Sequence, residues 1–253
     1  MNGLSDRLLH ALALRKWRRA ACRAETETLA ELRMQRNRAR VLRGHLDRLI
    51  HVADGRLSRP RMGSANFPRP LGTDWSWRPD LWRGPLPGAG LASAPNKAPV
   101  DDEVTLFHDC DKRDISLRQT RNTRDDDLAP FAVCMDVFGF DGSFLSLSVD
   151  LPREAGSGLT KSHLMRLDTS IETERPLGIS ARLNIQHGPN TEHIVRDLPA
   201  DSEARSVEFD LAYARVNEKR IEKIWLDLIF DAPEMNRMVV RDLTLCRHYR
   251  ADF

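Results

Sequence analysis

The chain has 253 residues and a mass of 28.8 kDa, enough for one large domain or for one domain with an arm. Its 41% hydrophobic and 30% charged residues are typical of a soluble globular protein. No stretch approaches the roughly 20 consecutive apolar residues that span a bilayer. The start of the chain does not resemble a secretory signal, so we expect synthesis in the cytoplasm without a signal peptide.

The charge is distributed unevenly along the chain. Residues 1–60 carry 14 basic and 6 acidic groups, a balance of +8, whereas the remaining residues carry 25 basic and 31 acidic groups, a balance of −6. A basic arm on an acidic body suits an acidic protein surface, a nucleic acid or an anionic lipid as partner. The four cysteines are far apart and include no CxxC pair, which favours free thiols over a disulfide framework.

Residues 4–53 are predicted to be helical because Ala, Leu, Arg and Glu dominate and the only glycine is Gly44. A break near residues 22–28 would divide this stretch into two helices. The second half has partial heptad spacing, so a helical hairpin and a short coiled coil both remain open. We name residues 1–55 the helical arm and assign it to attachment or oligomerisation.

Arginines form two clusters in the helical arm. Candidate attachment residues are Arg15, Lys16, Arg18, Arg19, Arg36 and Arg43. Phosphate contacts or an anionic lipid surface would both use such clusters. A helix that packs against other protein subunits, with its arginines solvated, accounts for them equally simply.

Residues 56–101 are predicted to be an extended segment, which we name the Pro/Trp segment. It holds eight of the fourteen prolines together with Trp75, Trp77 and Trp82. Disordered segments are poor in aromatic residues, so we expect this one to lie against the following domain, the helices or a neighbouring subunit. The three tryptophans are candidate ligand-binding residues because flat aromatic faces match the apolar faces of sugar rings. Packing is the alternative role.

Residues 102–253 alternate apolar and polar positions between frequent turns, which predicts an antiparallel β-sandwich of the jelly-roll type. The fold class is therefore mainly β, preceded by an α-helical arm. Trp225 is predicted to be a core residue. The predicted strands are 104–108, 131–138, 143–151, 163–172, 177–186, 192–198, 206–211, 223–230 and 237–247.

We find no motif for nucleophilic catalysis, no ligand set for a metal and no cofactor motif, and we predict none of these. The carboxylates of the strands mostly alternate with core residues, which places them on outward faces. The eight are Asp136, Asp150, Asp168, Glu172, Glu208, Asp210, Asp227 and Asp242. A solvated sheet face explains them, and a glycan or cation site is the alternative.

The closing run IWLDLIFDAPEMNRMVVRDLTLCRHYRADF, together with TDWSWRPDLWRGPL, resembles an uncharacterised alphaproteobacterial family of about this length. The resemblance implies that the C-terminal domain is a jelly roll of the galactose-binding or carbohydrate-binding-module type. The layout of helical arm and sandwich also resembles head spike proteins of phages and of gene transfer agents, which are virion-like particles. The family has no ligand motif from which binding residues could be carried over.

Three functions follow as hypotheses. The first is a non-catalytic platform that binds a polysaccharide and is attached to a larger assembly, such as a phage-like particle, through residues 1–55. It implies protein subunits as partners, a homo-oligomer, and release as part of a particle. The second is a glycoside hydrolase or lyase on the same fold, which needs two facing carboxylates in a cleft. The third is a nucleic-acid or membrane-surface adaptor that acts through the basic arm.

Overall fold

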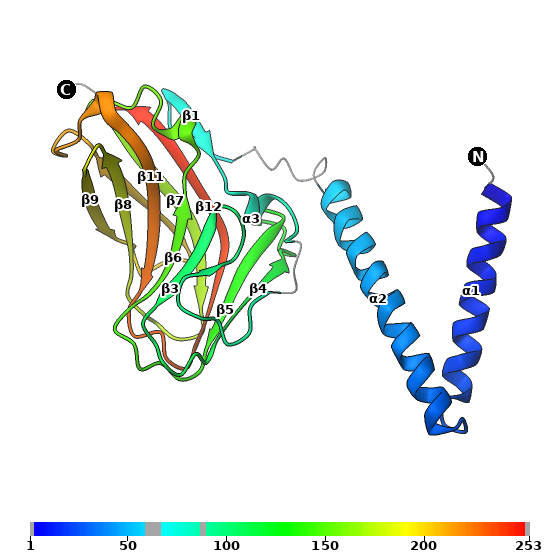
Figure 1. Cartoon of the computed structure of the whole chain (residues 1–253). Helices are drawn as coiled ribbons and strands as arrows, with labels where there is room; N and C mark the ends of the chain where they lie inside the picture. The colour runs from blue at the N-terminus through cyan, green and yellow to red at the C-terminus, as the bar shows by residue number, and fades with distance from the viewer. Residues whose placement is uncertain (1–2, 59–66, 87–89, 251–253) are drawn as a thin grey trace. The chain divides into compact units, whose positions relative to one another are not determined.

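The computed structural model describes residues 3–58, 67–86 and 90–250. The chain forms two compact units, Met1–His51 and Val52–Phe253. The first is helical and the second is mainly β, as Figure 1 shows. The predicted fold class is confirmed.

Two helices form the first unit, α1 (Gly3–Arg23) and α2 (Leu29–Ser58). The predicted break is confirmed, and it has a local cause. The Thr28 hydroxyl accepts from the backbone N–H of Glu31 at 3.3 Å and donates to the Glu31 carboxylate at 2.7 Å. The Thr28 side chain is therefore the N-cap of a new helix that starts at residue 29. The arm is therefore a helical hairpin within this chain.

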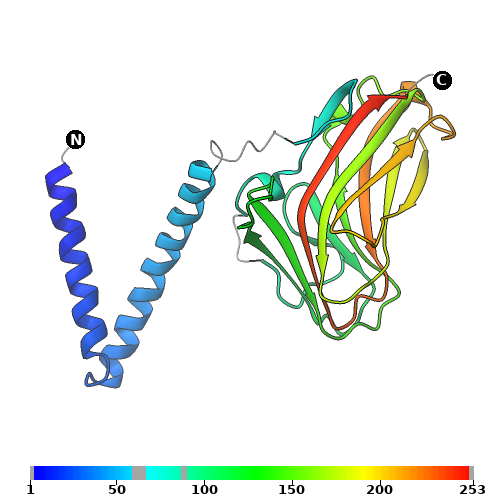
Figure 2. The same cartoon turned by 180° about the vertical axis from the view of Figure 1, so that it is seen from behind.

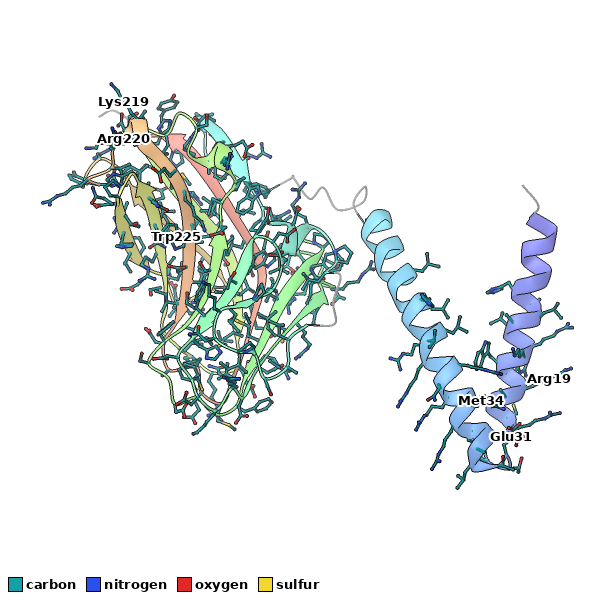
Figure 3. All side chains as sticks on the ribbon, viewed as in Figure 1. Arg19, Glu31, Met34, Lys219, Arg220 and Trp225 are labelled. Carbon is teal, nitrogen blue, oxygen red and sulfur yellow. The ribbon has the colours of Figure 1, made fainter. Side chains whose placement is uncertain are left out.

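The hairpin has no core of its own among the side chains that are described. None of residues 10–46 is buried, and Figure 3 shows their side chains projecting into solvent around Arg19, Glu31 and Met34. Exposed apolar residues include Leu12, Leu14, Leu29, Met34, Val41, Leu42, Leu46 and Leu49. Isolated helices are marginal in water without packing of an apolar face. The arm therefore depends on another surface for much of its stability.

The second unit consists of two antiparallel sheets, visible from both sides in Figures 1 and 2. Sheet A has the order β10-β7-β12-β5-β4, with β1 also paired to β12, and sheet B has the order β2-β3-β6-β11-β8-β9. The strands are β1 (Thr73–Trp77), β2 (Ala98–Pro99), β3 (Val104–His108), β4 (Ile115–Arg121), β5 (Phe131–Val137), β6 (Leu145–Asp150), β7 (His163–Thr173), β8 (Ile179–His187), β9 (Asn190–Asp197), β10 (Ala204–Asp210), β11 (Ile221–Phe230) and β12 (Asn236–Tyr249). The short helices are α3 (Asp80–Arg83), η1 (Arg153–Ala155) and η2 (Glu218–Arg220).

The core lies between the two sheets because alternate residues of each strand point inward. Leu145 and Leu147 of β6 are fully buried beside Leu228 of β11, for example. Each of the nine predicted strands has a counterpart within a few residues. The strands β1, β2 and β4 were not predicted. In β4, only Ile115 and Leu117 are apolar, which is too short an alternation to stand out.

The described residues 67–86 and 90–101 of the Pro/Trp segment pack as part of the sandwich unit, so the predicted boundary at residues 101/102 is not a domain boundary. The Pro/Trp segment contributes β1, which pairs with β12, and β2, which pairs with β3. Trp82 is completely buried, and its indole Nε1 donates to the carbonyl of Val240 at 2.9 Å. The segment folds in this way because its tryptophans supply apolar surface to the core. Pro60 and Pro87 lie outside the described residues.

Two ion pairs fasten the Pro/Trp segment to β12. Arg247 donates to Asp74 at 2.7 and 2.9 Å and also to the carbonyl of Ser157 at 2.8 Å. The hydrogen bonds from Arg247 hold the pKa of Asp74 below its ordinary value. Arg78, whose side chain is fully buried, donates to Asp242 at 2.7 and 2.8 Å. Bidentate pairs of this kind fix geometry as well as adding energy.

We predict that Trp82→Ala lowers the free energy of unfolding by about 3–5 kcal/mol, the usual cost of removing a buried aromatic side chain. Denaturant unfolding would measure the loss. Tyr213→Ala is the matched control, because Tyr213 is 81% exposed and its removal should cost about 0.5 kcal/mol or less. Equal stability of the two variants would contradict the assignment of Trp82 to the core.

Candidate functional site

A groove lies on the outer face of sheet B, and we name it the sheet B groove. Its volume is about 400 Å³. Aromatic, small polar and charged side chains line it: Phe107, Phe144, Ser146, Ser148, Arg182, Trp225, Asp227 and Ile229. This mixture of apolar surface with a few convergent polar groups is typical of ligand sites.

Alternation along β11 places one wall of the groove. Leu226 and Leu228 point into the core, so Trp225, Asp227 and Ile229 point outward. Figure 3 shows where Trp225 lies on β11. Trp225 is only half-buried. The prediction that Trp225 is a core residue is therefore wrong, because its side chain lies on the face of β11 opposite to Leu226 and Leu228.

Serines on β6 form the floor of the groove. Ser146 lies opposite Phe107 of β3 and Ile229 of β11, and Ser148 lies opposite Asp227. Because the serine side chains are short and their neighbours are large, a trough runs along β6. Ser146 is only 5% exposed, and its buried hydroxyl has no hydrogen-bond partner among the described residues. A buried hydroxyl of this kind is unusual and costs free energy.

A polar network closes the groove on the side of β8 and β9. The Oδ2 atom of Asp227 accepts from Arg182 at 2.9 and 3.1 Å and from Asn184 at 2.8 Å. Asn184 Oδ1 in turn accepts from His193 Nδ1 at 2.7 Å. The other oxygen of Asp227, Oδ1, makes no hydrogen bond with a described residue. The Arg182 side chain is 42% exposed. Its N–H donors and the acceptor Oδ1 of Asp227 are therefore held next to each other in the groove.

A lysine lies at the edge of the groove. The Lys223 ammonium is 5.7 Å from the centre of the Trp225 ring and 2.8 Å from Asp150. Both basic groups near the groove, Lys223 and Arg182, thus have a carboxylate partner. The groove carries fixed, balanced charge, which suits a ligand without net charge.

The tryptophans predicted to bind a ligand lie elsewhere. Trp75 and Trp77 belong to β1 in sheet A, where they are half-buried with ring centres 6.4 Å apart. Trp82 is fully buried and is therefore a packing residue that no ligand can reach. The structure does not bring these three to the sheet B groove. The alternation of residues 224–230 was the signal that could have identified Trp225.

The carboxylates of sheet A point outward, as predicted, but several are bound by arginines. Asp136 accepts from Arg237 at 2.6 Å and also from Arg118. Burial opposes its ionisation, but these two hydrogen bonds outweigh that effect and hold the pKa of Asp136 below its ordinary value. A solvated face is thus only part of the explanation, since arginines neutralise these acids.

The predicted attachment residues lie on the two arm helices. Arg15, Lys16 and Arg19 line a cleft of about 450 Å³ between α1 and α2, together with Trp17. Arg36 and Arg43 lie on α2, and Arg18 lies on α1, all at exposed positions. No helix among the described residues is long and apolar enough to cross a membrane. The described residues also include no group of three or more His, Cys, Asp or Glu side chains that could hold a metal ion.

Comparison with protein families places the chain in one of them. Residues 1–253 match a family described as "Family of unknown function (DUF6478)". No curated protein matches the chain.

Among solved structures, the enzymatically active domain of tailspike protein 4 from bacteriophage CBA120 matches at 7% identity with a TM-score of 0.40. That match covers 56% of this chain but only 19% of the tailspike chain. The family 11 carbohydrate-binding module from Clostridium thermocellum matches at 12% identity and a TM-score of 0.38, covering 62% of this chain and 96% of the module. The xylan-binding CBM22-1 domain from Paenibacillus barcinonensis Xyn10C matches at 8% and 0.38, covering 64% and 94%. Similarities this low carry no argument about what this chain binds.

We predict that Asp136→Asn destabilises the protein by about 1–3 kcal/mol at pH 7, where it removes hydrogen bonds between charged groups. Because the pKa of Asp136 is lowered by folding, its contribution is present above the unfolded pKa of about 3.9 and is lost as pH falls through the folded pKa. Urea unfolding at pH 7, 5 and 3 would show the gap from the unmodified protein closing at the lowest pH. Glu222→Gln, at an exposed position, should show no such gap, and a gap for Asp136→Asn that is independent of pH would refute the ion-pair account.

Proposed function

The chain belongs to DUF6478, a family of unknown function, and we propose that its sandwich binds a carbohydrate in the sheet B groove without catalysing a reaction. The observation that carries this proposal is the position of Trp225. It projects outward from β11, half-buried, into a groove whose other walls are Phe107 and Phe144.

The aromatic walls suit the apolar faces of sugar rings. Phe144 remains 40% exposed, and Trp225 is not needed to fill the core. Aromatic side chains bury large areas at little cost in conformational freedom, and they favour flat partners. A pyranose ring with its C–H groups on one face is such a partner. The trough along β6 is lined by short serines, which leaves room for a ring between the aromatic walls.

The polar side of the groove suits sugar hydroxyls. Asp227 Oδ1 can accept from one hydroxyl while the exposed N–H groups of Arg182 donate to a neighbouring one. Asn184 is 1% exposed and holds Asp227 in place, so these groups are preorganised. Preorganised groups lose little freedom when a ligand binds. The paired charges at Arg182 and Lys223 favour a neutral sugar over an ionic one.

We infer that the helical arm joins the sandwich to other protein subunits, including further copies of the chain, in an assembly such as a phage-like particle. The exposed leucines of α2 support this proposal, since solvent-facing apolar residues in such number mark interaction surfaces. In this arrangement the arm determines where the sandwich is held, and the sandwich determines what it binds. Release of the assembled particle would then place the sandwich outside the cell.

We predict that Trp225→Ala weakens carbohydrate binding at least about tenfold, because truncation of an aromatic residue at the centre of a binding site typically costs about 2 kcal/mol or more. A glycan array of neutral polysaccharide fragments would identify a ligand, and calorimetry would measure its affinity. Trp225→Phe should lose less than Trp225→Ala because it keeps an aromatic face.

Three further variants make this test specific. Tyr213→Ala removes an exposed aromatic residue that lies outside the sheet B groove and should bind normally. Trp75→Ala and Trp77→Ala test the tryptophans of β1 in the same assay. Loss of binding in these two variants but not in Trp225→Ala would move the site to β1. Cleavage of the bound glycan would instead favour a glycoside hydrolase or lyase.

We predict that the full chain has a mass in solution above that of one 28.8 kDa chain. Deletion of residues 1–58 should leave single chains. The double variant Leu42→Ser/Leu46→Ser should weaken association in the same way, because it removes exposed apolar surface from α2. Light scattering measures both masses. A single-chain mass for the full protein would contradict self-association through the arm.

A further inference from the structure

The helical arm carries a high density of positive charge that its own carboxylates do not balance. Residues 10–46 include ten arginines and lysines but only three acidic residues, Glu25, Glu27 and Glu31. All three lie in the break between α1 and α2 or in the first turn of α2. The stretches 10–24 and 32–46 therefore contain ten cations and no carboxylate.

Nine of these ten cations form no ion pair with a described residue. They are Arg15, Lys16, Arg18, Arg19, Arg23, Arg33, Arg36, Arg38 and Arg40. Two of the three carboxylates are held by neutral groups instead. Glu27 accepts from Gln35 at 2.8 Å, and Glu31 accepts from the Thr28 hydroxyl at 2.7 Å. The positive charge of the arm is thus available to a partner.

Arginines form an exposed row along each helix, because residues three or four apart lie on one side of a helix. The α1 row consists of Arg15, Arg19 and Arg23, and the α2 row consists of Arg33, Arg36 and Arg40. Like charges at these spacings destabilise a helix. The arm has no core among its described side chains that could compensate. An anionic partner that covers the rows would relieve this repulsion.

The chemistry of the rows favours phosphate as the anion. Every member is an arginine, whose planar guanidinium can form two parallel hydrogen bonds with one phosphate group. Each row extends over about 10–12 Å of helix, whereas duplex DNA carries about one negative charge per 1.7 Å of its axis. A nucleic acid can therefore contact every arginine of a row at once.

A cleft of about 450 Å³ beside the helices adds to this charge. The α1 row lines it together with Lys16 and Arg38, whereas Glu27 is the only carboxylate in its lining. Clefts lined by one sign of charge concentrate the electric field and raise the local concentration of counter-ions. The cleft is thus a second feature of the arm that attracts a polyanion.

The arrangement of α1 does not suit a lipid surface. A helix that lies in a bilayer interface carries its apolar residues on one side and its cations on the other. Leu12 is 57% exposed, and it precedes Lys16 by four residues and Arg19 by seven. This spacing places Leu12 on the same side of α1 as the cations. Insertion of Leu12 would therefore bring charged groups into the apolar layer.

The α2 row leaves the exposed leucines of α2 accessible for protein contacts. Leu42 follows Arg40 by two residues, and residues two apart do not face each other on a helix. Leu46 lies on the side of Leu42, four residues later. Association through these leucines and contact of the arginines with an anion therefore use different sides of α2.

We propose that the α1 row and the α2 row bind the phosphate backbone of a nucleic acid without distinguishing its base sequence. Contacts to the backbone carry no sequence information, so charge and salt concentration determine the affinity. The inference goes beyond the proposed function and is independent of it, because it concerns the helical arm alone and not the sheet B groove.

The test uses the full chain and a fluorescein-labelled DNA of about 30 nucleotides, supplied as a single strand and as a duplex. Fluorescence anisotropy should show binding that weakens about a hundredfold or more when NaCl rises from about 50 to about 200 mM, as about four phosphate contacts require. Two unrelated base sequences should bind within about twofold of each other. Binding to neither form of DNA, or an affinity that does not depend on salt, would overturn the proposal.

Replacement of each row by glutamine assigns the binding to its arginines. The two variants are Arg15→Gln/Arg19→Gln/Arg23→Gln and Arg33→Gln/Arg36→Gln/Arg40→Gln. Each should weaken DNA binding at least about tenfold, because it removes three phosphate contacts. Glutamine forms helices about as well as arginine and removes the repulsion, so the helical signal in circular dichroism should be unchanged or higher. Unchanged affinity in either variant, or a lower helical signal, would overturn the proposal.

A charge-matched control separates the rows from the net charge of the protein. Lys112→Gln/Lys161→Gln/Lys219→Gln also removes three positive charges, from exposed positions of the sandwich. This variant should bind DNA within about twofold of the unmodified chain, since its lysines lie outside the arm. A loss of affinity equal to that of the row variants would overturn the assignment to the rows.

Two other polyanions test the identity of the partner. Polyglutamate carries negative charge without phosphate, and phosphatidylserine vesicles present an anionic lipid surface. Both should bind the full chain at least about tenfold more weakly than DNA at an equal concentration of negative charge. Equal or tighter binding of polyglutamate would indicate an acidic protein as partner, and equal or tighter binding of the vesicles would indicate a membrane. Either result would overturn the proposal.

Discussion

The inward and outward alternation of side chains along β6, β7, β10 and β11 is the constraint on which the rest of this structure depends. One half of each strand must fill the space between the sheets, which fixes the register of the whole strand. The other half is then free of any packing role between the sheets. Trp225 and Asp227 belong to this second half, and so does Ser146. The same constraint that builds the core thus presents the residues of the sheet B groove.

Alternation also explains how much of the fold can be predicted from sequence. Strands such as β6 and β11, with regular leucines, were identified within one or two residues of their ends, and the break between α1 and α2 was found from composition. The Pro/Trp segment could not be placed, because its partners are far away in sequence. Trp82 bonds to Val240, and Arg78 binds Asp242, more than 150 residues later. Nothing local to residues 56–101 specifies those contacts.

The candidate site was predictable only in part, for a related reason. Side chains alternate along a strand, so the position of Trp225 next to Leu226 is enough to predict that it points outward. The prediction from sequence nevertheless assigned Trp225 to the core. Its convergence with Phe107 depends on the strand order β3-β6-β11, which brings three segments from different parts of the chain together.

The central claim is that Trp225, and not another tryptophan, contacts the carbohydrate. The chain contains five tryptophans, Trp17, Trp75, Trp77, Trp82 and Trp225, so labelling with 5-fluorotryptophan gives a small number of fluorine resonances to assign and follow by NMR. Titration with a neutral oligosaccharide should shift the Trp225 resonance and leave that of the buried Trp82 in place. A shift confined to Trp75 or Trp77, or no shift at a saturating sugar concentration, would contradict the account.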